Sequence, residues 1–290
     1  MTKLLLATTA LVASASFASA GAHISMSGSA GAGVGVNGTS GGTGDNNGEM
    51  HLYSGVDLDI SMSGTSDSGV EFGASLSIDN RSNWYDTGDF EFDGGSTGTS
   101  FGNVYITSGG LTITLDDGGI GGLYDGDEDH DMKIAYATGG ISFAMTYDVD
   151  SDNACTGCEV SGVDYSVSYS AGALGFSLTG NDSDDLVIGV TYSAGAFSAG
   201  LSLDDNDGTQ TSTISVGYSE GAFSIDASAA DDSTWDVSVG YSEGGTSISA
   251  STDEASAWEV TGSVDLGGGL AAVAGVNADS DWYLGATMSF

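Results

Sequence analysis

The sequence predicts an all-β fold, a transmembrane antiparallel up-and-down β-barrel with an even number of strands. Apolar residues alternate with small or polar residues along nearly the whole chain, which is the pattern of strands with two different faces. Tight, nearly uncharged turns alternate with longer acidic connections, as in an antiparallel meander. Tyrosines gather at one end of the expected strands and tryptophans at the other, as in the aromatic belts of membrane proteins.

Residues 1–20 are predicted to be a secretory signal peptide. Lys3 supplies a basic start, an apolar run extends from Leu4 to about Ala18, and small residues precede a cleavage site after Ala20. The alternative is a retained membrane anchor, but the apolar run is short for a segment that needs ~20 apolar residues. Residues 21–290 are then expected to form the barrel, which the aromatic rows and the resemblance described below assign to an outer membrane.

The strands follow from strict alternation, which residues 186–192 and 197–204 illustrate on either side of the turn in YSAGAFSAG. The same pattern recurs after each turn signal, so the count reaches eighteen. The expected strands lie at about 22–36, 50–62, 69–79, 101–108, 110–116, 131–138, 141–148, 160–170, 173–180, 185–193, 196–204, 210–219, 222–229, 234–242, 245–252, 256–266, 269–277 and 281–290.

The charge of the chain excludes some partners. There are 41 acidic residues and three basic ones, and removal of the signal peptide leaves only Arg81 and Lys133. A nucleic-acid partner is excluded because phosphate binding needs a basic surface, and anionic substrates are disfavoured for the same reason. The chain has no proline, as suits many strands that pair on both edges.

The apolar face could meet lipid or pack against a second sheet in a soluble sandwich. The opposite face carries mainly Ser, Thr, Gly and Asp, which suits a water-filled lumen, and the aromatic residues that share the apolar face form two rows. Ordinary enrichment of aromatics in strands is the alternative explanation of these rows. The two expected girdles comprise Tyr136, Tyr169, Tyr192, Tyr218 and Tyr241 at one end and Trp235, Trp258 and Trp282 at the other.

The last strand is expected to close the barrel against the first. It ends on Phe290, and its apolar face carries Trp282, Leu284, Ala286 and Met288. Since the first strand starts on the periplasmic side and the last must end there, the number of strands is even.

With these features the chain resembles the Gram-negative general diffusion porins of the alphaproteobacterial, Rhodobacter-like type. The leader LLLATTALVASASFASA, the segments FGNVYITSGGLTITLDD and KIAYATGGISFAMTYD, and the strand ending in Phe290 carry the resemblance. It implies a homotrimer in the bacterial outer membrane, embedded in lipid, for passive diffusion of small hydrophilic solutes. It also implies sixteen strands, two fewer than the strand count, and a third long loop, here Asp116–Asp131, folded into the lumen as a constriction.

The expected constriction is acidic, whereas the family usually sets an arginine cluster across from it, which this sequence lacks. A carboxylate ring attracts cations and repels anions, so we expect a cation-preferring channel; a solvated acidic loop is the alternative. Lys133 should point into the lumen and pair with an acidic residue there, or stand as a lone charge in water. The candidate constriction residues are Asp116, Asp117, Asp125, Asp127, Glu128, Asp129, Asp131 and Lys133.

Calcium is an alternative ligand of this loop, because Asp125, Asp127 and Asp129 offer hard oxygen atoms. An EF-hand loop starting at Asp125 would need Gly and Glu where His130 and Tyr136 stand, so that motif fails. Apart from calcium, no cofactor is expected.

Cys155 and Cys158 lie in another acidic connection and are expected to form a local disulfide in an exported protein. A thioredoxin-like redox motif lacks its βαβ setting, and a zinc site lacks further ligands. No catalytic constellation emerges, so we expect no enzyme. The alternative function is that of a secreted acidic β-rich surface protein, an adhesin or solenoid without channel activity, although a solenoid would show one constant repeat length.

Overall fold

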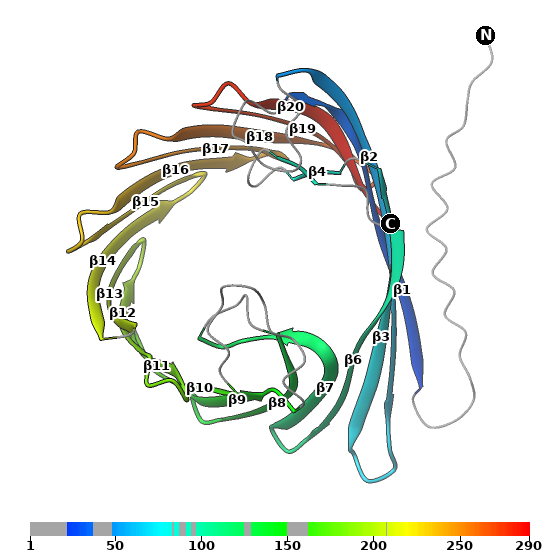
Figure 1. Cartoon of the computed structure of the whole chain (residues 1–290), viewed down its shortest axis with the longest axis vertical. Helices are drawn as coiled ribbons and strands as arrows, with labels where there is room; N and C mark the ends of the chain where they lie inside the picture. Colours follow the sequence, from blue (N-terminus) through cyan, green and yellow to red (C-terminus); the bar gives the residue numbers. More distant parts are fainter. Residues whose placement is uncertain are drawn as a thin grey trace.

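The computed structural model describes residues 22–36, 48–82, 84–86, 91–93, 97–124, 129–149, 162–206 and 208–290. Eighteen strands form one antiparallel sheet that closes into a barrel, and a two-stranded ribbon, β4–β5, lies apart from it (Figure 1). The strands are β1 (His23–Val36), β2 (Met50–Thr65), β3 (Glu71–Ser82), β4 (Trp84–Asp86), β5 (Glu91–Asp93), β6 (Thr97–Ser108), β7 (Leu111–Gly121), β8 (Asp129–Thr138), β9 (Ile141–Tyr147), β10 (Val163–Ala171), β11 (Leu174–Asn181), β12 (Leu186–Ala194), β13 (Phe197–Asn206), β14 (Thr209–Glu220), β15 (Phe223–Ala230), β16 (Trp235–Glu243), β17 (Thr246–Asp253), β18 (Trp258–Gly267), β19 (Leu270–Asn277) and β20 (Trp282–Ser289).

The barrel closes where the last strand pairs with the first. β20 runs antiparallel to β1 from Val36↔Trp282 to Ser29↔Ser289. Beyond β20, Phe290 N donates to Gly28 O at 2.9 Å, so the terminal residue also belongs to the seam. The even strand number and the count of eighteen are confirmed, and the sixteen strands implied by the resemblance are wrong for this chain. A solenoid, which never pairs its first strand with its last, is incompatible with this closure.

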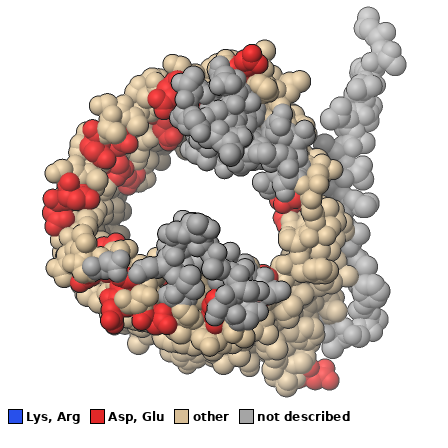
Figure 2. All heavy atoms as spheres, in the orientation of Figure 1, with Lys and Arg blue, Asp and Glu red and all other residues tan. Residues whose placement is uncertain are grey.

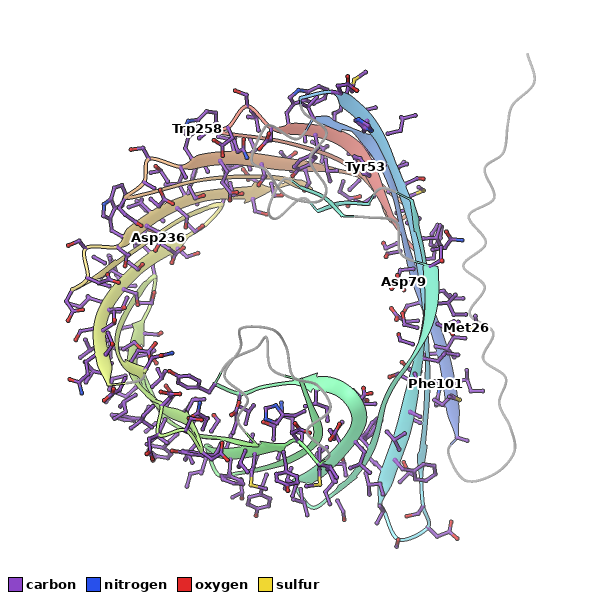
Figure 3. The ribbon with its side chains drawn as sticks, viewed as in Figure 1. Met26, Tyr53, Asp79, Phe101, Asp236 and Trp258 are labelled. Carbon is purple, nitrogen blue, oxygen red and sulfur yellow. The ribbon has the colours of Figure 1, made fainter. Side chains whose placement is uncertain are left out.

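The two faces of the sheet meet different surroundings. Met26 points away from the barrel and Asp79 points into it (Figure 3). Register extends this assignment around the wall, since the apolar residues of each strand stand opposite apolar residues of the next. Among the described residues, the only buried hydrophobic ones are Tyr53, Ile120 and Tyr283, whereas Leu52 is 75% exposed and Phe197 64%. The apolar side chains therefore cover the outside of the barrel rather than fill a core.

The tight turns at the two ends of the barrel place different residue types at the positions with positive φ. At one end glycines adopt positive φ, as Gly195 does in the β12–β13 turn, where a side chain would be strained. At the other end β11–β12 and β19–β20 are joined by four-residue loops in which Asp184 and Ser280 take the left-handed conformation. In both loops an asparagine, Asn181 or Asn277, accepts two backbone N–H bonds at 2.9–3.0 Å. The acidic connections after β10 are thus tight turns rather than long loops.

Two segments lie inside the wall rather than in it. The β4–β5 ribbon is one, and the end of β7, which curves into the barrel, is the other (Figure 1). Across the described ranges, no helix is long and apolar enough to cross a membrane.

Candidate functional site: the channel lumen

The inner face of the barrel is polar and acidic. Asp57 of β2 stands opposite Asp79 of β3, and Asp236 of β16 stands opposite Asp253 of β17. Paired hydroxyls fill much of the remaining wall, such as Ser249 and Thr261, whose oxygens lie 2.6 Å apart. Carboxylates also surround the mouth of the barrel, and none of the described residues on the face in view is Lys or Arg (Figure 2).

The wall is interrupted at β7, whose end curves into the barrel (Figure 1). β7 pairs with β8 in regular register up to Leu115↔Met132, and pairing resumes only at Ile120↔His130. The four β7 residues 116–119 therefore stand against the single β8 residue Asp131, a bulge that bends the strand. Pairing of β6 with β7 likewise reaches no further than Val104↔Leu115, so the end of β7 leaves its neighbour.

Two wall carboxylates hold the segment that follows β7. Oδ2 of Asp164, on β10, accepts hydrogen bonds from the backbone N–H groups of Leu123 at 2.7 Å and of Tyr124 at 2.9 Å. The Tyr124 hydroxyl donates to Oδ1 of Asp204, on β13, at 3.2 Å. Because Asp164 is fully buried, these bonds to its charge are shielded from water. The loop after β7 is thereby fastened across the inner wall from β10 to β13.

The electrostatics of this attachment favour a neutral tyrosine. Burial, followed by the negative charges of Asp204 and Asp185, raises the pKa of Tyr124 to about 12 from its ordinary 10.0; a hydrogen bond with Asn206 acts in the opposite direction. Tyr124 therefore stays protonated, and able to donate to Asp204, throughout the physiological range.

Two further polar side chains are buried next to this loop. His130 of β8 and Thr146 of β9 are both completely buried, and neither the imidazole nitrogens nor the threonine hydroxyl forms a hydrogen bond with any described residue. Thr146 stands between Lys133 and Asp164 in the register of β8, β9 and β10. Unpaired buried polar atoms are costly, so these two side chains reduce the stability of this part of the wall.

The structure places the predicted constriction residues in two groups. Asp116 and Asp117 lie in the β7 bulge, and Asp129, Asp131 and Lys133 lie on β8, so both ends of the predicted loop adjoin the attachment. Oδ2 of Asp131 accepts the backbone N–H of Val149 at 2.6 Å, which fixes the start of the next connection.

Other predicted residues lie outside the described part of the chain. Asp125, Asp127 and Glu128 are among them, so both the ion pair of Lys133 and the calcium site stay predictions. Within the described ranges, no group of three or more His, Cys, Asp or Glu side chains could hold a metal ion. The signal peptide, Cys155 and Cys158 also lie outside, so cleavage and the disulfide stay predictions.

The aromatic residues expected at the girdles lie on the outer face. Tyr136, Tyr169 and Tyr192 at one end are 42–49% exposed, and Trp235 and Trp258 at the other are 41% and 44% exposed. Phe290, at the end of the last strand, is 71% exposed.

Neighbouring hairpins are joined by aromatic contacts across strands. Phe197 pairs with Tyr218 at a ring distance of 4.8 Å, and Phe223 pairs with Tyr241 at 5.0 Å. The Tyr241 hydroxyl donates to Glu243 Oε2 at 2.9 Å, and Tyr218 makes the same bond to Glu220. The tyrosine and the glutamate of each YSEG turn therefore act together at the edge of the apolar band.

Comparisons with known proteins agree with this geometry. The family model described as Gram-negative porin matches residues 7–289. Among solved structures, a triple mutant of the porin of Rhodopseudomonas blastica matches with a TM-score of 0.56 at 15% identity, covering 92% of this chain and 100% of that one. Two further mutants of the same porin match over the same shares, with TM-scores of 0.55 and 0.56 at 15% and 13% identity. No curated protein sequence matches.

Proposed function

The chain belongs to the Gram-negative porin family and is a β-barrel protein of the bacterial outer membrane, and from this premise we propose that it forms a water-filled, cation-preferring channel for passive diffusion of small hydrophilic solutes. The proposal rests on one observation above all: ten or so strands of the wall carry carboxylates, whereas the described strands carry only two basic residues, Arg81 on β3 and Lys133 on β8. A narrow lumen of one charge concentrates ions of the opposite charge and repels ions of the same charge.

The attachment of the segment after β7 to the inner wall supports a channel with a selective constriction rather than an unobstructed pore. Leu123 and Tyr124 are fastened to Asp164 and Asp204, and the acidic run of the sequence follows directly after this attachment. Cations would pass the carboxylates of the loop and of the opposite wall at short range, where water screens their attraction less.

We also propose a homotrimer, because one row of outward-facing residues across the seam consists of small residues only. It runs through Ala272 of β19, Ala286 of β20, Ala32 of β1 and Ser54 of β2, and small residues allow another barrel to approach closely. Sedimentation of the detergent-solubilised protein tests this proposal, with the mass of three chains expected and the mass of one chain contradicting it.

Planar-bilayer recording of the folded protein tests the channel itself. Stepwise conductance increases in KCl are expected, and the same detergent without protein is the control. Folded, inserted protein that gives no steps would contradict the proposed function. Swelling of liposomes that contain the protein, in sugars of increasing size, then measures the size limit of uncharged solutes.

A further inference from the structure

Two tyrosines lie flat on the inner wall where the barrel closes. The ring of Tyr53 extends from β2 across β1 to β20, passing over Gly33 and Gly285. A Cβ built on Gly33 would lie 2.4 Å from the Tyr53 hydroxyl oxygen, and one built on Gly285 would lie 2.0 Å from it. Since glycine alone has no Cβ, these two positions make room for the ring.

Tyr283 repeats this arrangement on the next strand pair. Its ring lies over Gly275 of β19, where a Cβ would come within 2.4 Å of Cε1. Val273 packs against the two tyrosines. Both rings face the lumen, yet Tyr53 is 5% exposed and Tyr283 4%.

The internal β4–β5 ribbon lies next to the part of the inner wall that carries Tyr53 and Tyr283, which we call the aromatic floor. β4 runs beside β2, the strand that carries Tyr53. The ribbon pairs Trp84↔Asp93, Tyr85↔Phe92 and Asp86↔Glu91, and it lies inside the ring of strands next to β2 and β20, facing the curved end of β7 on the other side of the lumen (Figure 1). Two internal segments thus approach the channel axis from opposite walls.

We infer that the β4–β5 ribbon is a second constriction element, seated on Tyr53 and Tyr283 as positioning residues, that limits the size of passing solutes and adds to cation preference. The inference rests on the proposed channel function. The two strands of the ribbon carry the acidic residues Asp86, Glu91 and Asp93 and no Lys or Arg, so their charge has the same sign as that of the wall.

Removal of the ribbon tests its role in size selection. In a variant in which a short Gly-Ser linker replaces residues 84–93, we expect single-channel conductance to rise roughly 1.5- to 2-fold, and larger sugars to enter liposomes, because the narrowest section widens. If the native chain conducts and the variant conducts equally, this inference is wrong while the proposed function stands. A native chain that never conducts contradicts the proposed function itself.

A single substitution next to Tyr283 tests whether the ribbon rests on the aromatic floor, without shortening the chain. Gly275→Ala places a methyl group against the Tyr283 ring alone, so the ring must lift and the ribbon above it must shift. We expect conductance to change relative to the native channel. Gly98→Ala, on β6, is the matched control, because a Cβ there meets nothing within 4 Å, and its conductance should stay native. Native conductance in a folded Gly275→Ala channel would contradict the inference that Tyr283 positions the ribbon.

Charge neutralisation tests the contribution to ion preference. The triple variant Asp86→Asn, Glu91→Gln and Asp93→Asn should lower the reversal potential across a KCl gradient while conductance steps persist. The control removes three charges from exposed outer turns, Asp182→Asn, Asp184→Asn and Asp279→Asn, and should leave most of that potential intact. Equal shifts in both variants would show that the ribbon has no special place in the pathway.

Discussion

The Tyr124 hydroxyl lies 3.2 Å from Oδ1 of Asp204, although the two residues are 80 positions apart in the sequence. This bond joins the loop that follows β7 to the wall strand β13, on the far side of β10, where Asp164 holds the same loop by its backbone. Three groups from three parts of the chain therefore fix the segment that immediately precedes the acidic run against the inner wall.

Loss of the tyrosine hydroxyl should loosen the loop without unfolding the barrel. Tyr124→Phe keeps the ring and removes one hydrogen bond, which is worth about 1 kcal/mol. We expect more frequent current fluctuations in single-channel records at an unchanged thermal unfolding midpoint. Tyr136→Phe, on the lipid-facing side, is the control and should record like the native channel. If current fluctuations in the Tyr124→Phe variant were no more frequent than in the native protein, the bond would not restrain the loop.

Alkaline pH should release the same bond. The pKa of Tyr124 is raised from 10.0 to about 12, so the folded protein keeps this proton where the unfolded chain loses it. The stabilisation is complete below pH 10 and is lost as the pH rises to about 12. Current fluctuations should therefore increase only above pH 10, and a tyrosinate absorbance titration should show one late-titrating group that Tyr124→Phe lacks. An early titration of this group would contradict its burial beside Asp204 and Asp185.

Replacement of Asp164 should release the loop more completely. Asp164→Ala leaves the N–H groups of Leu123 and Tyr124 without their charged acceptor, and each such bond contributes about 1.5–3 kcal/mol. We expect new protease cleavage in the loop after β7 and a change in conductance. Asp226→Ala, another carboxylate facing the lumen, is the control and should remain resistant there. If both variants were equally resistant to protease, Asp164 would not be needed to hold the loop after β7.

The contribution of the tyrosine girdle to the stability of the barrel should come from the aromatic rings more than from the hydroxyl groups. Tyr241→Ala loses the contact with Phe223, worth about 0.5–1.5 kcal/mol beyond the buried area. Tyr241→Phe keeps the ring and loses only the exposed bond to Glu243, so it should cost less. Urea unfolding of the protein in lipid vesicles measures both. Equal destabilisation by the two changes would assign the effect to the hydroxyl.

The barrel was predictable because its signal is local. Alternation with a period of two identifies each strand within its own few residues, and all eighteen expected strands are present with ends shifted by a few residues. The short β4–β5 ribbon was missed because strands of three residues carry too little pattern to separate them from a loop.

The site was predictable only in part because its contacts are distant in sequence. The acidic run after β7 marks the loop, but nothing in it indicates which wall residues hold it. Asp164 and Asp204 lie 41 and 80 residues from their partners and look like any other acid at a strand end. Tyr53 over Gly33 and Gly285 was equally hidden, since the closing of the ring brings β20 beside β1.

The reversal potential of the native channel across a KCl gradient tests most directly whether the acidic lumen selects cations. With high salt on one side of a planar bilayer and low salt on the other, we expect a potential that is negative on the high-salt side, since K⁺ crosses toward the dilute side more readily than Cl⁻. The magnitude should fall when both concentrations are raised, because salt screens the wall carboxylates. A potential near zero or of the opposite sign at low salt would contradict cation preference, whatever the conductance.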